Sequence, residues 1–222
     1  RNFCNKLWNI ARYIEDTIGD ETSREGVKPV SAADHWALHK LAEAQTKIAN
    51  DLDNYRFSEA YDKLYHFVWD DIADWYIEAS KAQTNKALLA YLLEAILTLA
   101  HPFAPFVTET IWQTLAWEND SVLATRELLQ VPRSDAKQAA DFGEIQAIVT
   151  EVRFIIKALR VSGVTLYYSS VPFLSENAEI IKSLGRLKAV TEVSDGVGLY
   201  LTSTKHACWL DIDQGTARAY LK

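Results

Sequence analysis

Methionine is absent from this sequence of 222 residues, and cysteine occurs only at Cys4 and Cys208. Because translation begins with methionine, its complete absence leads us to expect a segment of a longer polypeptide. The two cysteines form no Cys-x-x-Cys pair and no cluster with histidine, so neither a disulfide framework nor a zinc site is expected. Isolated thiols are typical of a reducing compartment, and we expect a cytoplasmic protein.

Long apolar stretches are also missing. The longest, residues 87–100, is too short to span a bilayer and contains Glu94. The N-terminal residues lack the pattern of a secretory signal. We therefore expect no membrane partner, and residues 87–100 are interpreted as a buried helix. Hydrophobic residues make up 49% of the chain and charged residues 24%, which is typical of a globular protein.

No familiar catalytic motif is present. The sequence has no Gly-x-Gly-x-x-Gly, Walker A, Gly-x-Ser-x-Gly or His-Glu-x-x-His pattern. Asp34, His35 and His39 form an array whose two histidines lie one helical turn apart, a spacing that can hold the metal of a metal-dependent hydrolase. The motif has no further ligands in reach, however, and ordinary histidines near a helix N-terminus explain it better. We predict no catalytic residue and no metal site.

A row of acids recurs every fourth residue at Asp70, Asp74 and Glu78. This spacing places the three carboxylates on one face of a predicted helix. Such rows usually form a solvated face, and Lys63 and Lys81 are placed to pair with them. Other ligand types are missing nearby, so the row is not interpreted as a metal site.

Residues 1–117 have the periodicity of helices. In the first helix, Phe3, Leu7, Ile10 and Ile14 form one apolar stripe. Short connections between successive helices predict antiparallel neighbours, so residues 1–133 are interpreted as an antiparallel helical bundle. The later helices are predicted to begin at a capping box of Ser31 and Asp34, and to cover residues 58–81, 85–100 and 105–117.

The pattern changes after residue 131. Helices are predicted over residues 145–160 and 175–187, the second beginning with a cap at Ser175, and the last residues resemble the start of another helix. We interpret residues 134–222 as a small α+β module, and the fold class as mainly α. The β-type stretches of this module are residues 164–168, 189–193, 197–201 and 207–212.

The polar side of the first helix carries no acid between residues 1 and 13, although the whole chain has a formal charge of −7. Amides and arginine pair with base edges, tyrosine stacks on unpaired bases, and lysine and arginine bind phosphates. The face therefore favours contact with single-stranded RNA, the alternative being that its asparagines cap or bridge neighbouring helices. Its residues are Asn2, Asn5, Lys6, Asn9, Arg12 and Tyr13.

Three segments of the chain resemble one family. Residues 1–13, RNFCNKLWNIARY, are similar to the segment that follows the catalytic domain of valyl-tRNA synthetases. The second segment, DHWALHKLAEA followed by YRFSEAYDKLYHFVWDDIADWYIEASK, and the third, LTLAHPFAPFVTETIWQTL, are similar to later segments of that family in the same order. The HPFAPF element has related forms in isoleucyl and leucyl enzymes, whereas NKLWN and DWYIE point to the valyl branch.

The resemblance implies the anticodon-binding bundle of a class Ia aminoacyl-tRNA synthetase, followed by a small module that leads to a coiled-coil arm absent here. A whole family member uses ATP, with magnesium, to ligate valine to its tRNA. The HIGH and KMSKS motifs of the catalytic domain do not occur in this sequence, and the editing domain is missing. The segment is therefore interpreted as part of a valine–tRNA ligase. Alone, it is predicted to be inactive and to hold no cofactor.

Carried over by motif position, the residues implied to bind the tRNA anticodon are Lys6, Asn9, Arg12 and Tyr13. The implied partner is the anticodon loop of valine tRNA, bound by a monomer. Tyr13 stands where the family usually has phenylalanine, a change that preserves stacking. His101 is expected to pack or to cap a helix. Large aromatic residues are predicted to lie in the core: Trp8, Trp69, Trp75, Tyr76 and Trp112.

Two alternatives remain open from the sequence. One is a helical protein-interaction module that docks on a partner through its first helix. The other is the equivalent region of an isoleucyl- or leucyl-tRNA synthetase.

Overall fold

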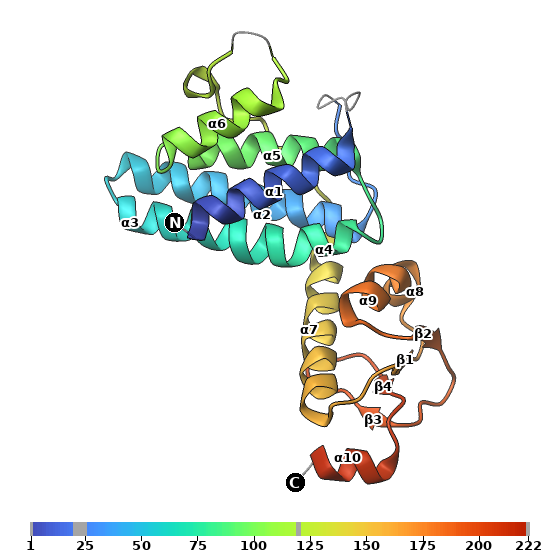
Figure 1. Cartoon of the computed structure of the whole chain (residues 1–222). Coiled ribbons are helices and arrows are strands. Elements are labelled where there is room, and N and C mark those ends of the chain that lie inside the picture. Colours follow the sequence, from blue (N-terminus) through green and yellow to red (C-terminus); the bar gives the residue numbers. More distant parts are fainter. Residues whose placement is uncertain (1, 20–25, 119–120, 221–222) are drawn as a thin grey trace. The chain divides into compact units, whose positions relative to one another are not determined.

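A computed structural model describes residues 2–19, 26–118 and 121–220 (Figure 1). The chain divides into two compact units. The first contains Arg1–Val30, Asp34–Ile77 and Thr84–Asp135, and the second contains Ser31–Ala33, Glu78–Gln83 and Ala136–Lys222. Helices dominate, with one small sheet near the C-terminus, which confirms the predicted fold class. Within the described ranges, every helix is too short or too polar to cross a bilayer.

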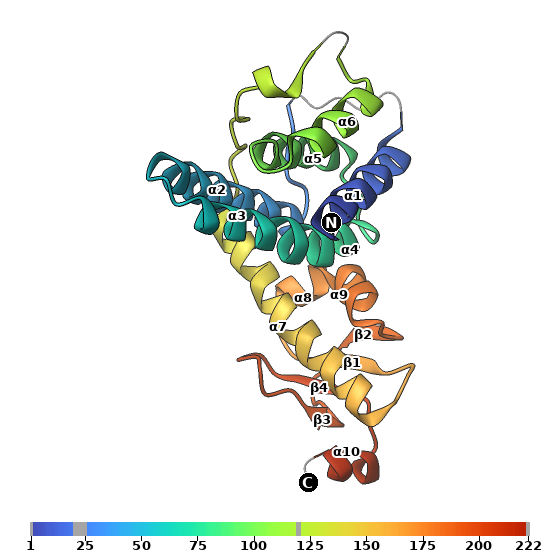
Figure 2. The ribbon, with the colours of Figure 1, turned by 60° about the vertical axis from the view of Figure 1, so that its left-hand side comes forward.

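Helices account for the regular structure as far as residue 135. The predicted helices all form, and Figures 1 and 2 show α1 lying alongside α5. The elements are α1 (Asn2–Ile18), α2 (Ala32–Asp53), α3 (Phe57–His66), the π-helix η1 (Phe67–Tyr76), α4 (Ile77–Ser80), α5 (Lys86–Ala100), α6 (Pro105–Leu115) and the 3₁₀ turn η2 (Leu123–Thr125).

The apolar stripe of α1 lies in the core, as predicted. Phe3, Leu7, Ile10 and Ile14 are all buried, and the stripe continues to Ile18 at the end of the helix. The stripe packs on α5 and α6, and α1 also contacts η1. Burial of this stripe leaves the opposite side of α1 to solvent, which is the side that the sequence singled out.

The predicted helix over residues 58–81 is continuous in the structure but changes type at its centre. Over η1 the backbone follows π-helical geometry, and the N–H of Ile77 donates to the carbonyl of Ile72, five residues earlier. Most π-helical segments are a single turn, and they occur frequently at functional sites. The apolar pattern of this segment predicts a helix but does not distinguish its type, so the π geometry could not be predicted.

The HPFAPF segment forms the corner between α5 and α6. Pro105 occupies the first turn of α6, where its missing N–H costs nothing. A hydrogen bond of 2.9 Å joins His101 Nδ1 to the hydroxyl of the buried Thr108, so the expected packing role of His101 is confirmed. The helix ends at Leu115, before the predicted residue 117, because Ala116 takes a left-handed conformation with φ of 47°.

The second unit contains a four-stranded sheet in the order β2-β1-β4-β3. Strand β1 pairs in parallel with β2 and antiparallel with β4, which also pairs antiparallel with β3. Helices α7 and α9 pack together, and α9 also contacts β2. The elements are α7 (Ala136–Leu159), β1 (Thr165–Tyr168), α8 (Pro172–Glu176), α9 (Ala178–Gly185), β2 (Ala189–Glu192), β3 (Leu199–Tyr200), β4 (Cys208–Leu210) and α10 (Gln214–Tyr220).

Two sequence predictions for this unit need correction. The predicted helix over residues 175–187 is two helices, and Ser175 lies inside α8 rather than at a cap, because Pro172 begins the helix. Helix α7 begins at Ala136, nine residues before the predicted start at residue 145. The predicted strands and the final helix form. The domain boundary after residue 133 stays a prediction.

Glycine is required in the loop between β2 and β3. A Cβ atom on Gly196 would lie 1.9 Å from the ring of Trp209. Gly198 has a φ of +124°, and a Cβ there would lie 2.0 Å from the carbonyl oxygen of Leu210. The loop can cross the sheet this closely only without side chains at these positions.

Candidate nucleic-acid interface

The predicted RNA-binding face of α1 is at the surface, but its residues differ in how they are held. Asn2, Asn5, Asn9 and Arg12 are exposed. Lys6 and Tyr13 are half-buried, and both lie beside η1. The four predicted site residues therefore form two groups, with Lys6 and Tyr13 on one side of the helix and Asn9 and Arg12 further out.

Lys6 is held by two contacts to η1. Its Nζ lies 2.9 Å from Asp74 Oδ1 and 4.6 Å from the centre of the Trp69 ring. The Lys6 side chain is 24% exposed and that of Asp74 is 52% exposed. An ammonium group has three N–H donors, so an ion pair and a ring contact fix its position and leave donor capacity for a ligand.

Trp69 belongs to a row of rings along α3 and η1, here named the aromatic row: Tyr61, Tyr65 and Trp69. Tyr65 stacks on Trp69, with ring centroids 5.4 Å apart and an interplanar angle of 16°. Tyr61 lies 6.4 Å from Tyr65 and is 40% exposed. Phe3 of α1 contacts both tyrosines. Trp69 is half-buried rather than fully buried, and its ring also supports Lys6 at the surface.

Tyr13 lies close to a buried hydrogen-bonded group. The hydroxyl of Tyr76 donates to Asp34 Oδ1 over 2.9 Å. The pKa of Tyr76 is raised well above its ordinary value, first by burial, then by the charge of Asp34 and its hydrogen bond, and also by Tyr13. Tyr76 is a core residue, as predicted. Tyr13 is therefore half-buried beside this group, and part of its side chain remains exposed.

Trp8 was predicted to lie in the core, and this prediction is wrong. Its side chain is 41% exposed on α1. At about 100° per residue, Trp8 lies about 130° from the centre of the apolar stripe, so the helical period itself contained the signal. Trp112 and Tyr76 are buried as predicted, whereas Trp75 is half-buried.

The acid-free face is smaller in three dimensions than in the sequence. Helix α1 continues to Ile18, and its exposed Glu15 and Asp16 extend the polar side beyond Tyr13. Asp74 of η1 adds a carboxylate next to Lys6. The basic and amide surface is therefore confined between acids, which limits its reach to a few phosphates or bases.

The acid row at residues 70–78 is paired with basic side chains. Asp70 contacts His66 Nδ1 over 2.6 Å, Asp74 contacts Lys6, and Glu78 contacts Lys81 over 2.6 Å, as predicted for Lys81. The hydrogen bond to Asp70 raises the pKa of His66, with further contributions from neighbouring carboxylates and a smaller opposing effect of burial. These contacts account for the row as part of a paired surface.

The Asp34, His35 and His39 motif is used in structural contacts. Asp34 is buried, and its Oδ2 accepts hydrogen bonds from the N–H of Val30 and from Asn85 Nδ2. His35 Nδ1 accepts from the backbone N–H of Asp135, and His39 contacts Glu43. Asp34 therefore joins the start of α2 to the start of α5. Across residues 2–19, 26–118 and 121–220, no three acidic, histidine or cysteine side chains gather closely enough to hold a metal ion.

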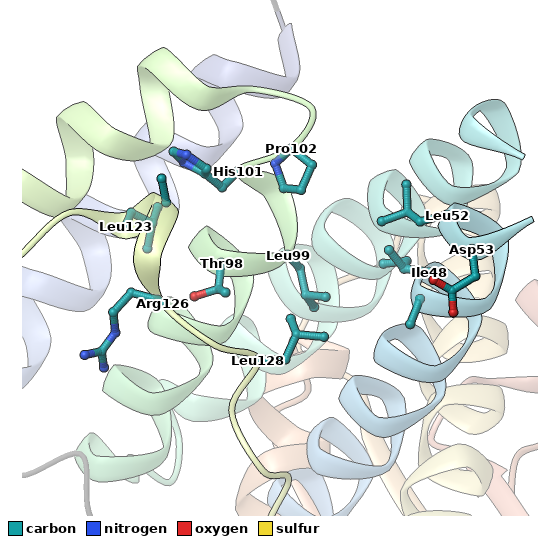
Figure 3. Close-up of a pocket in the computed structure, with 12 residues that line it drawn as sticks. Ile48, Leu52, Asp53, Thr98, Leu99, His101, Pro102, Leu123, Arg126 and Leu128 are labelled. Carbon is teal, nitrogen blue, oxygen red and sulfur yellow. The ribbon is translucent and has the colours of Figure 1, made fainter. Parts of the chain in front are cut away.

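A cavity of about 340 Å³ lies between the ends of α2 and α5 and the segment around η2. Figure 3 shows Leu99 and Leu128 close together, opposite Ile48 of α2, while the guanidinium of Arg126 points away from the cavity. That guanidinium pairs with the buried Glu94 and with Glu118. The cavity is lined mainly by aliphatic side chains and its cation is already paired, so it does not resemble a site for a charged ligand.

The anticodon-binding domain of tRNA ligase is the family whose model matches this chain, over residues 34–165. This match covers more than half of the chain, and the chain belongs to that family. The matched residues begin after α1, so the family match rests on the rest of the bundle and on α7.

Individual relatives define the branch. A valine–tRNA ligase of Bacillus cereus is 38% identical over 169 residues, covering 69% of this chain and 19% of the relative. Those of Staphylococcus epidermidis and of Staphylococcus aureus (strain Newman) are 35% and 34% identical and cover 80% and 84% of this chain. The resemblance to valyl-tRNA synthetases is confirmed. The chain spans about a fifth of the length of these relatives, 19% to 23%.

A solved structure supports the fold. The LeuRS in a ternary complex with tRNA and LeuAMS from Agrobacterium radiobacter K84 has a TM-score of 0.50 to this chain at 13% identity. The similarity covers 76% of this chain and 18% of that one. At this identity the likeness shows the fold alone.

Proposed function

We propose that this chain is the anticodon-recognition part of a valine–tRNA ligase and that it binds the anticodon loop of valine tRNA through the polar face of α1. The observation that carries the proposal is the exposure of Asn9 and Arg12 beside a fixed Lys6, on a chain of the anticodon-binding family. A net charge of −7 is compatible with this role, because a local patch binds RNA while the remaining surface repels other polyanions.

The proposed contacts follow from the donors that each side chain offers. Arg12 presents guanidinium donors to a phosphate or a base edge, and Asn9 presents both a donor and an acceptor to a base. Lys6 directs its remaining N–H donor capacity from a position fixed by Asp74 and Trp69. Tyr13 provides the open part of its ring for stacking.

The properties of the whole ligase belong to the same proposal. We propose that the complete protein uses ATP with magnesium to join valine to its tRNA in the cytoplasm, and that it acts as a monomer. The sequence lacks the HIGH and KMSKS motifs, and we expect this segment alone to bind no ATP and to be inactive in aminoacylation.

The experiment is a binding titration with anticodon stem-loops. The chain is titrated with a stem-loop carrying a valine anticodon and with one whose middle anticodon base is changed, at low and moderate salt. We expect preference for the valine loop, weaker binding at higher salt, and loss of the preference in Lys6→Ala with the fold intact. Equal affinity for both loops in the parent would contradict anticodon recognition by this chain.

Protein docking is the second candidate function. Phe106 on α6 is 88% exposed, and it borders an open groove of about 720 Å³ that Pro105 and Val122 also line. A contiguous exposed apolar patch beside a groove is typical of a protein-binding surface, and Val122 is also exposed there. A Phe106→Ala variant that binds the stem-loop like the parent but loses a co-purifying protein would favour this function.

A further inference from the structure

A cleft of about 130 Å³ lies between α1 and α6. Trp8, Arg12 and Glu15 line it from successive turns of α1, at spacings of four and three residues. On the α6 side it is lined by Ile111 and Leu115. The cleft thus combines an open aromatic ring, one cation, one anion and an apolar wall.

The charged groups of the cleft are not used by the fold. Arg12 and Glu15 are both exposed, and across the described ranges neither forms an ion pair or a side-chain hydrogen bond. Lys6 provides the contrast on the same helix, because it is held by Asp74 and Trp69. Donor and acceptor groups at the cleft are therefore available to a ligand.

The chemistry of the cleft selects the kind of ligand. Its volume suits one planar ring system and is below the range of about 300–1,000 Å³ found for sites of drug-sized molecules. A phosphate in the cleft would be repelled by the Glu15 carboxylate beside it. A nucleobase offers a face to Trp8 and an edge with both donors and acceptors to Glu15 and Arg12.

We propose that this cleft binds one unstacked nucleobase of a single-stranded RNA loop, with the base stacked on Trp8 and its edge hydrogen-bonded by Arg12 and Glu15. The proposal rests on the proposed function and adds to it a second contact on α1. Lys6 and Tyr13 lie on the side of α1 that faces η1, and Trp8 lies on the side that faces α6. One helix therefore contacts two separate nucleotides of the loop.

The test uses anticodon stem-loops in which 2-aminopurine replaces one loop base at a time. Its fluorescence reports stacking on an aromatic ring at a defined position. Binding of the parent chain is compared with Trp8→Ala, Trp8→Phe and the control Phe106→Ala, which removes another exposed aromatic residue of the same unit. Melting of each variant checks that the fold is retained.

We expect the parent to change the fluorescence of one loop position, and Trp8→Ala to abolish that change. Trp8→Ala is also expected to weaken binding about five- to 150-fold, the range for loss of one stacked base, while Trp8→Phe recovers most of the affinity. Phe106→Ala should bind like the parent. If Trp8→Ala fails to fold, Glu15→Gln takes its place and should reduce the response at that same position.

The contrary outcomes separate this proposal from the proposed function. RNA binding that depends on Lys6 but is unchanged in Trp8→Ala would overturn the base-binding cleft and leave anticodon recognition standing. Equal weakening for a fully paired RNA hairpin stem would also overturn it, since no unstacked base is present there. Failure of the parent to bind any stem-loop would overturn the proposed function itself, and the cleft with it.

Discussion

On the side of α1 that faces η1, the Lys6 side chain is 24% exposed and is held between Asp74 and Trp69. On the side that faces α6, Trp8 is 41% exposed, and the charges of Arg12 and Glu15 are unpaired among the described residues. The first side is pre-organised by contacts from another helix, so its cation loses little freedom on binding. The second side is free to adapt to a ligand. We infer that the side facing η1 fixes the geometry of RNA binding. The side facing α6 contributes most of the binding energy that depends on adaptation to the RNA.

Reversing the charge of Arg12 should strongly weaken RNA binding. We expect Arg12→Glu to weaken binding of the stem-loop about ten-fold or more, because a guanidinium that pairs with a phosphate or base is replaced by a repelling carboxylate. Stability should be unchanged, since Arg12 makes no ion pair in the described structure. Arg133→Glu, an exposed arginine of the same unit, is the matched control and should bind nearly as the parent does.

Removing Trp69 should affect both stability and binding on the pre-organised side. Trp69→Ala loses the stack on Tyr65 and the ring beneath Lys6. We expect unfolding to become about 1–3 kcal/mol easier, together with weaker RNA binding. Denaturant melts and titrations check this. Trp69→Phe should recover part of both; a variant with full stability and full affinity would show that the ring does not position Lys6.

Neutralising Asp74 should change the affinity for RNA in the opposite direction from Trp69→Ala. Asp74→Asn removes an exposed ion pair, so stability should fall by only about 0.2–1 kcal/mol. Binding to both the valine loop and the loop with a changed middle base should become tighter, and the preference between them should decrease, because Lys6 is no longer directed. Asp70→Asn, which removes an acid paired with His66 instead, is the control. Unchanged selectivity in Asp74→Asn would mean that the ion pair has no positioning role.

The smallest effect is expected from pH. The pKa of His66 is raised in the folded protein, mainly by its hydrogen bond to Asp70. A raised pKa means that the stabilising contribution is complete below the unfolded-state value of about 6.5 and is lost as pH rises through the folded value. Melting temperatures measured from about pH 6 to about pH 8 should decline less steeply with rising pH in His66→Gln and in Asp70→Asn than in the parent. Parallel profiles in all three proteins would contradict this assignment.

The sequence was sufficient to predict the contacts that depend on the helical period of about 3.6 residues. The stripe from Phe3 to Ile14 predicted which side of α1 is buried, and therefore which side is exposed. The same period places Trp8 outside the core, against the general tendency of tryptophan to be buried. Pro172 could likewise have marked the start of α8.

Contacts between distant segments could not be predicted in this way. Lys6 and Asp74 are separated by 68 positions, and their pairing depends on how η1 packs against α1. The π-helical geometry of η1 also leaves no signal in the apolar pattern. The residue types of the candidate site could therefore be predicted from the sequence. Only the structure shows that the side of α1 facing η1 is held by contacts, whereas the charges on the side facing α6 are unpaired among the described residues.

The most direct test of the central claim is to map where a bound anticodon loop touches the protein. A stem-loop with a photoreactive base at each anticodon position is crosslinked to the chain, and the modified peptides are identified by mass spectrometry. The account predicts crosslinks within α1, between Asn5 and Tyr13, that Arg12→Glu reduces. Crosslinks confined to the second unit, with none in α1, would contradict recognition by this helix.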